Sequence, residues 1–165
     1  MSKQLTLSTV SKLHAKEFNE QKKVTLKTGD FIMIQTKFRK TNVQNMLVEY
    51  QEILESMKNM NVDFGVIKDI SFVYYMLLLR HFTNLNNIPK DINKMVSVCE
   101  KLIDLDILEE IFESFELEEL KKIDEMIKKI SNNSNLIGKQ MGEIFTKAVI
   151  NESVKDDEDG LQQSE

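Results

Sequence analysis

Residues 66–82, VIKDISFVYYMLLLRHF, form the most apolar helix that the sequence predicts. It holds the most apolar run of the chain, from Phe72 to Leu79, which Arg80 ends. A helix that spans a bilayer needs about 20 apolar residues, so this run predicts no membrane role. Apolar positions lie on nearly all sides of the predicted helix, which is typical of a helix that packs against several neighbours. We therefore expect the helix over 66–82 to form the centre of the fold.

Length and composition agree with one helical domain. The chain has 165 residues, of which 41% are hydrophobic and 30% are charged, a balance typical of globular proteins. Five glycines and a single proline favour helix over a turn-rich β sandwich. The only cysteine, Cys99, cannot form an internal disulfide, which favours a reducing compartment. Residues 1–8 have no sustained apolar stretch, so we expect no signal peptide.

Amphipathic helices are predicted on both sides of this centre. The clearest begins at Thr41, which has capping-box spacing with Gln44. One apolar stripe follows it at helical spacing: Val43, Met46, Leu47, Tyr50, Leu54 and Met57. After the break at 83–89, Asp91 is a candidate cap for another helix. The stripe of that helix holds Ile92, Met95, Val96, Cys99, Leu102 and Ile103.

Three more helices are predicted towards the C-terminus. Asp104 or Asp106 is expected to cap a short helix that ends near Phe115. The next helix is predicted over residues 116–130, with an apolar stripe that starts at Leu117. Lys128 and Lys129 are expected in its last turn. Residues 131–135 are predicted to be a loop. Asn135 then caps a final helix with one apolar stripe: Ile137, Met141, Ile144, Phe145 and Ala148.

The N-terminal part is predicted to contain a β-hairpin. Apolar residues alternate on both sides of the turn signal Thr28-Gly29-Asp30, so residues 22–37 fit two strands. A lone hairpin is only marginally stable in water, so it must lie against the helices or pair with another chain. Residues 1–20 are ambiguous: Leu5 and Leu7 alternate as in a short strand, and Ser8 or Thr9 could then cap a helix with Val10, Leu13 and Phe18 on one side.

The expected fold class is therefore mainly α with a small N-terminal β-hairpin, in a compact bundle of five or six helices. We expect three parts. Residues 1–40 form an N-terminal segment whose hairpin packs on the bundle, and residues 41–150 form the helical domain. Residues 151–165 lose all periodicity and are expected to be a disordered acidic tail.

The chain shows no recognisable catalytic or metal-binding pattern. His14 and His81 lie far apart without neighbouring ligands, and we expect His81 to bond to carbonyls at its helix end. Cys99 falls on an apolar stripe, as a small core residue does. Gly138 and Gly142 lie inside a helical pattern and match no phosphate loop. We expect no enzyme and no cofactor, although a small enzyme with dispersed catalytic residues remains an alternative.

A strongly acidic stretch is the main candidate for binding. Nine carboxylates lie between Glu100 and Glu119, where Lys101 is the only base. They form either a solvated face or a docking surface for a basic partner. They would repel DNA, so we expect no nucleic-acid partner. The candidate partner-binding residues are Glu109, Glu110, Glu113, Met141 and Phe145.

The order of these features resembles the tail assembly chaperones of long-tailed bacteriophages, particularly phages of Gram-positive hosts. The resemblance covers about residues 20–130. It rests on the hairpin, on FRKT at 38–41 opening a helix, on LRHFT at 79–83 ending a very apolar helix, and on IPKD at 88–91 before the acidic segment.

The resemblance implies a small, mostly helical protein of the infected cell's cytoplasm that is absent from the mature virion. It would bind the long apolar tape measure protein, help to recruit tail tube subunits, and self-associate. Nine methionines agree with adaptable apolar contact. The competing hypothesis is an acidic regulatory interaction module that inhibits or recruits a host or phage protein.

The net charge of −5 is unevenly distributed. Residues 151–165 hold six acids and one base, so residues 1–150 are neutral overall. Within them, residues 1–60 carry +4, residues 61–130 carry −5 and residues 131–150 carry +1. This polarity suggests head-to-tail association or docking of a partner.

Overall fold

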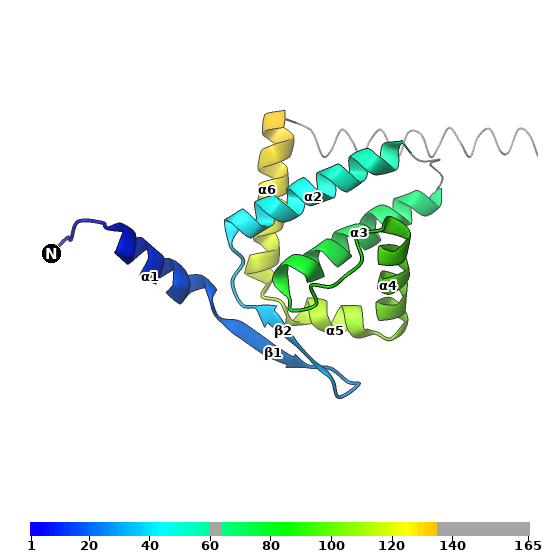
Figure 1. Ribbon diagram of the computed structural model, residues 1–165, viewed down its shortest axis with the longest axis horizontal. Helices are drawn as coiled ribbons and strands as arrows, with labels where there is room; N and C mark the ends of the chain where they lie inside the picture. The colour runs from blue at the N-terminus through cyan, green and yellow to red at the C-terminus, as the bar shows by residue number, and fades with distance from the viewer. Residues whose placement is uncertain (60–63, 135–165) are drawn as a thin grey trace, which may run out of the picture.

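A computed structural model describes residues 1–59 and 64–134 of the chain (Figure 1). The described part contains six helices and one two-stranded antiparallel sheet, which confirms the expected fold class. In chain order the elements are α1 (Leu7–Phe18), β1 (Gln21–Thr25), β2 (Phe31–Gln35), α2 (Lys40–Lys58), α3 (Phe64–Phe82), α4 (Ile92–Asp104), α5 (Ile107–Ser114) and α6 (Leu117–Ser134).

The central helix is α3, as its apolar surface predicts. It packs against α2 and α4, while α4 contacts α5 and α2 contacts α6. Every residue of the apolar stripe predicted for α2 is buried. On α3, Met76, Leu77 and Leu79 have no exposed surface. Periodicity therefore identified the buried face of α2, and the apolar surface on nearly all sides of α3 identified its central position.

The predicted hairpin is present and lies against the end of α3. Gln21 pairs with Gln35 and Thr25 with Phe31, and Gly29 adopts a φ of 92° in the turn, a conformation that favours glycine. Ile34 forms a bridge with Thr83, which directly follows α3. This contact, together with the burial of Ile32 and Ile34, stabilises a hairpin that would be marginal alone.

The first helix, α1, extends away from the helical body and joins the hairpin at the end opposite the turn between β1 and β2 (Figure 1). Its last turn is tied to the chain after β2, where Glu17 pairs with Lys37 at 2.6 Å. It buries none of its residues. Thr6 caps it by accepting a hydrogen bond from the backbone N–H of Thr9, at 3.2 Å. The cap therefore lies before Ser8 and Thr9, and the strand reading of residues 5–7 was wrong. The hydroxyl cap of Thr6 therefore favours a helix in this segment, in which no residue is buried.

The start of α2 differs from the predicted capping box. Its N-cap is Arg39, which makes no side-chain cap hydrogen bond. Instead Glu119, from α6, accepts a hydrogen bond from the backbone N–H of Phe38 at 2.7 Å. Lys122 lies 2.7 Å from the same carboxylate. Glu119 therefore anchors the residue that precedes the N-cap, and the predicted Thr41–Gln44 capping box does not mark the start of α2.

The position of His81 also corrects the sequence analysis. Its Nε2 atom lies 2.7 Å from a carboxylate oxygen of Glu49, not against helix carbonyls. Glu49 also pairs with Arg80, whose guanidinium donates to the carbonyls of Ile88 and Pro89 at 3.0 and 2.9 Å. The end of α3 is therefore tied to α2 and to the following loop.

The C-terminal half confirms some local signals and corrects others. Asp91 caps α4 by accepting from the N–H of Lys94 at 3.0 Å, as predicted. Asp106 precedes α5 in a left-handed conformation and makes no side-chain cap bond. α6 continues through Ser134, so the loop prediction was wrong for residues 131–134, and Lys128 and Lys129 do not lie in a last turn. Leu117 is 65% exposed, contrary to its assignment to the buried stripe.

Candidate functional site

Two hollows meet at Tyr75 on the outer face of α3, and together we call them the Tyr75 groove. The first hollow, of about 390 Å³, lies between α3, the end of α4 and α5. The second, of about 370 Å³, lies between α2, α3 and α6. Tyr75 lines both hollows, so they adjoin each other at this residue of α3.

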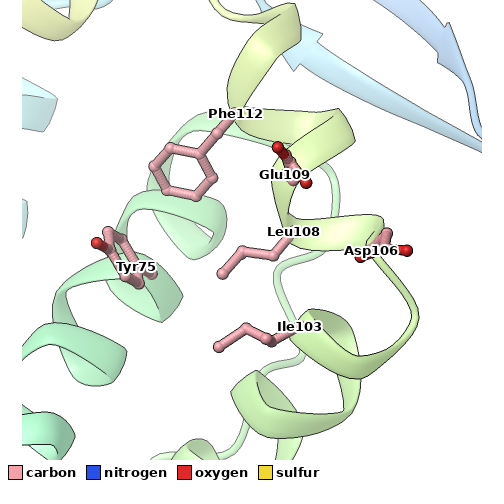
Figure 2. A pocket seen from close by; sticks show the side chains of 6 residues that line it. All are labelled: Tyr75, Ile103, Asp106, Leu108, Glu109 and Phe112. Atoms are coloured by element: carbon pink, nitrogen blue, oxygen red, sulfur yellow. The ribbon is translucent and has the colours of Figure 1, made fainter.

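The first hollow has apolar walls. Figure 2 shows Ile103, Leu108 and Phe112 pointing from α4 and α5 towards the α3 side that carries Tyr75. Ile103 is 39% exposed, so the hollow is open to solvent. The carboxylate of Asp106 points away from Tyr75, at the outer edge (Figure 2). Glu109 also lines this hollow and places a second acid there.

The second hollow repeats this pattern of apolar surface beside an acid. Its α3 side holds Ile70, Ser71, Tyr74 and Tyr75, and Tyr50 comes from α2. α6 contributes Ile127 and Asp124. Both walls of the Tyr75 groove therefore combine apolar side chains with carboxylates, a composition suited to an apolar ligand that also carries positive charge.

A row of aromatic contacts holds the floor of the groove in place. The ring of Tyr75 meets that of Phe112 edge-to-face at 5.2 Å, and Tyr74 lies 6.0 Å from Tyr75. Tyr50 packs on Tyr74 at 5.6 Å and donates its hydroxyl hydrogen to the carbonyl of Ile70. Edge-to-face pairs are each worth about 0.5–1.5 kcal/mol beyond area burial. The floor is thus pre-formed by α2, α3 and α5.

Tyr50 and Tyr74, in the second hollow, stay protonated over the physiological range. Burial raises the pKa of Tyr74 to about 12, with smaller contributions from Asp124 and Tyr75. Burial also raises the pKa of Tyr50, with a contribution from Tyr74. These hydroxyls are therefore neutral hydrogen-bonding groups in the wall of the groove.

Of the five candidate residues, the structure describes the three glutamates of α5. Glu109 lines the Tyr75 groove, and Glu113 is exposed four residues later on α5. Glu110 is partly buried and accepts a hydrogen bond from the backbone N–H of Lys27 at 3.0 Å, so it stabilises the hairpin turn. Met141 and Phe145 lie outside the described residues, as do the predicted final helix and the tail 151–165.

Sequence reasoning missed the residues at the centre of the groove. Tyr74 and Tyr75 were included only in the apolar surface of the central helix, and Ile103 was assigned to the core. The available signal was that α3 is apolar on more sides than its contacts with α2 and α4 can cover. An adjacent tyrosine pair, with one polar atom on each ring, is also suited to a half-exposed surface.

Other kinds of site find no support in the described residues. Over 1–59 and 64–134, no group of three His, Cys, Asp or Glu side chains could hold a metal ion. Cys99 is buried, and burial, with a smaller effect of Glu100, raises its pKa to about 11. None of the helices described is long and apolar enough to cross a membrane.

These features define a mainly helical protein with a pre-formed, acid-edged apolar groove. The sequence profile of the YomO family matches residues 7–162, so the chain belongs to the YomO family. It is similar to "SPbeta prophage-derived uncharacterized protein YomO" of Bacillus subtilis (strain 168), with 27% identity over 127 residues. That match covers 77% of this chain and 75% of the relative. No solved structure matches the chain. Together, the family and this relative indicate a phage-associated protein.

Proposed function

We propose that this protein is a non-enzymatic tail assembly chaperone that binds the tape measure protein and assists assembly of the tail tube. It would act in the cytoplasm of the infected cell and be absent from the mature virion. Membership in the YomO family and similarity to a prophage-derived relative support a phage role. The resemblance described above supports the more specific assignment.

The Tyr75 groove is the observation that carries this proposal. An apolar groove between helices accepts an amphipathic helix, whose anchors recur at positions i, i+3, i+4 and i+7. The two hollows on either side of Tyr75 could each receive one anchor. Asp106, Glu109 and Asp124 would favour Lys or Arg beside those anchors. A long helical client such as a tape measure protein offers such segments.

Co-expression with the tape measure protein of the same phage tests the proposal. We expect the chain to keep that protein in the soluble fraction and to co-purify with it. Ser71→Lys places a long cation in the groove at an exposed position and should abolish both effects. Ser97→Lys is the matched control, because Ser97 is exposed on α4 and does not line the groove. If the two proteins neither co-purify nor change each other's solubility, the proposal fails.

The acidic regulatory module remains a second candidate because of α5. Glu109 and Glu113 are exposed on the same helix face, and within the described chain neither makes an ion pair. Such a module should slow growth when expressed in a bacterial host. The double variant Glu109→Lys/Glu113→Lys should relieve that effect. Glu110 is left unchanged because it supports the hairpin. Unaltered growth inhibition in the double variant would count against this candidate.

A further inference from the structure

The helix α1 leaves an apolar face exposed in the described fold. Leu7, Val10 and Leu13 are 86%, 44% and 57% exposed. Val10 and Leu13 line an open hollow along this face, together with His14 and Phe18. Their spacing of i, i+3, i+4 and i+8 places these four side chains on one side of the helix. An exposed apolar surface of this kind is typical of a contact with another molecule.

The same helix is directed away from the Tyr75 groove of its own chain. Only Asn19 and Glu20 separate it from β1. Arg39 donates a hydrogen bond to the side chain of Asn19 at 2.8 Å, and Lys37 pairs with Glu17 at 2.6 Å. These contacts hold the last turn of α1 beside the chain that follows β2, and α1 and α4 lie on opposite sides of the body (Figure 1). The apolar face of α1 is therefore open to a second molecule.

The first hollow of the Tyr75 groove offers a matching surface elsewhere on the molecule. Ile103 lines this hollow and is 39% exposed, and Leu105, which follows α4, is 61% exposed. Asp106 and Glu109 line the hollow as well. Within the described part of the chain, neither acid forms an ion pair. An apolar hollow with unpaired acids favours a ligand that is apolar and positively charged.

The charges around α1 complement those acids. Residues 1–16 contain Lys3, Lys12 and Lys16 but no acid. On a helical projection, Lys12 and Lys16 lie opposite Val10, so they stay at the surface when the apolar face is covered. Their long side chains can reach an acidic edge while their stems cover apolar surface. α1 of a second copy therefore brings both properties that the hollow favours.

We propose that α1 of one molecule docks in the first hollow of the Tyr75 groove of a second molecule of the same protein. The helix has 12 residues and is about 18 Å long, with Leu7, Val10 and Leu13 as its anchors. Helix and groove are different surfaces, so the contact is heterologous: mutual exchange closes a dimer, and one-way exchange extends a chain of molecules. This self-association does not depend on the proposed chaperone function, although a tape measure helix would compete for the same groove.

Sedimentation velocity of the full-length chain at increasing concentration tests this contact, and we expect the unmodified chain to associate. Leu13→Glu places a charge on the apolar face of α1, and Ile103→Lys places a cation in the hollow. Each should raise the concentration needed for association by about 30-fold or more. The matched controls are Ala15→Glu, at an exposed position of α1 outside its apolar face, and Val48→Lys, at a 55% exposed position of α2. Both controls should associate as the unmodified chain does.

An equimolar mixture of the two disrupted variants identifies the surfaces that meet. Leu13→Glu keeps an intact groove and Ile103→Lys keeps an intact α1, so the mixture should form a 1:1 complex although neither variant associates alone. A mixture that stays monomeric would mean that α1 packs on α1 of another copy, and it would overturn the proposal. An unmodified chain that is monomeric at every concentration, or association that either variant leaves intact, would overturn it as well.

Leu13→Glu also separates this proposal from the chaperone function. Its groove is intact, so the monomeric variant should still keep a tape measure protein soluble. If the variants and their mixture behave as expected but no tape measure protein binds to Leu13→Glu, the self-association is upheld and the chaperone function is refuted.

Discussion

The carboxylate of Glu119 accepts a hydrogen bond from the backbone N–H of Phe38, and the two residues are 81 positions apart. Phe38 has no exposed surface, and its ring stacks on Phe82 at 3.9 Å between centroids. Its carbonyl lies 3.4 Å from Lys122 Nζ, which also pairs with Glu119. One buried carboxylate therefore joins the junction before α2 to α6, and its negative charge suits the N-terminal end of α2.

Replacing this carboxylate should destabilise the protein. In Glu119→Ala the amide of Phe38 loses its acceptor in a buried site, which costs about 1–3 kcal/mol, and Lys122 loses its partner. We expect the free energy of unfolding, measured in urea, to fall by about 2 kcal/mol. Glu118→Ala is the matched control, because that side chain is 81% exposed, and it should change stability by less than about 0.5 kcal/mol. Equal effects of the two substitutions would contradict this role for Glu119.

The Glu119–Phe38 bond also shows where reasoning from sequence ends. Helical periodicity predicted the buried stripe of α2, and the residue type at Asp91 predicted the cap of α4. Both could be predicted because they depend on residues close in the sequence. The acceptor for Phe38 depends on how α6 packs, so the Thr41–Gln44 spacing was misleading. The Tyr75 groove could not be predicted from the sequence for the same reason. Sequence shows that α3 is apolar all round, but only the positions of α5 and α6 determine which apolar side chains stay uncovered.

The Glu49 carboxylate should be a second stabilising group between distant segments. It pairs with both Arg80 and His81 and is only 27% exposed. Glu49→Ala leaves the guanidinium of Arg80 without its acid partner, so we expect a loss of about 1.5–3 kcal/mol in urea unfolding. Glu52→Ala, at an exposed position of the same helix, should have little effect. A neutral result for Glu49→Ala would mean that the carbonyls of Ile88 and Pro89 suffice for Arg80.

The same substitution should have a large effect on stability in α2 and almost none in α1. Leu13 of α1 is 57% exposed, whereas Leu47 of α2 is 1% exposed. Leu47→Ala should lower the free energy of unfolding by about 2–5 kcal/mol, because it leaves a cavity in the core. Leu13→Ala should change it by less than about 0.5 kcal/mol. Urea denaturation of dilute protein measures both. A large effect of Leu13→Ala would show that α1 is covered in solution, for example by a second copy.

The buried thiol of Cys99 predicts a component of alkaline unfolding. Burial raises its pKa from 9.0 to about 11, so the folded state holds the thiol proton where the unfolded state has lost it. The stabilisation is complete below pH 9 and is lost as the pH rises to about 11, by about 1.4 kcal/mol per pH unit. Cys99→Ala removes this component but keeps those of Tyr50 and Tyr74. Its free energy of unfolding should therefore fall less steeply between pH 9 and 11. The slope is the measurement to compare, because the truncation also lowers stability at every pH; identical slopes would mean that the thiol titrates normally in the folded chain.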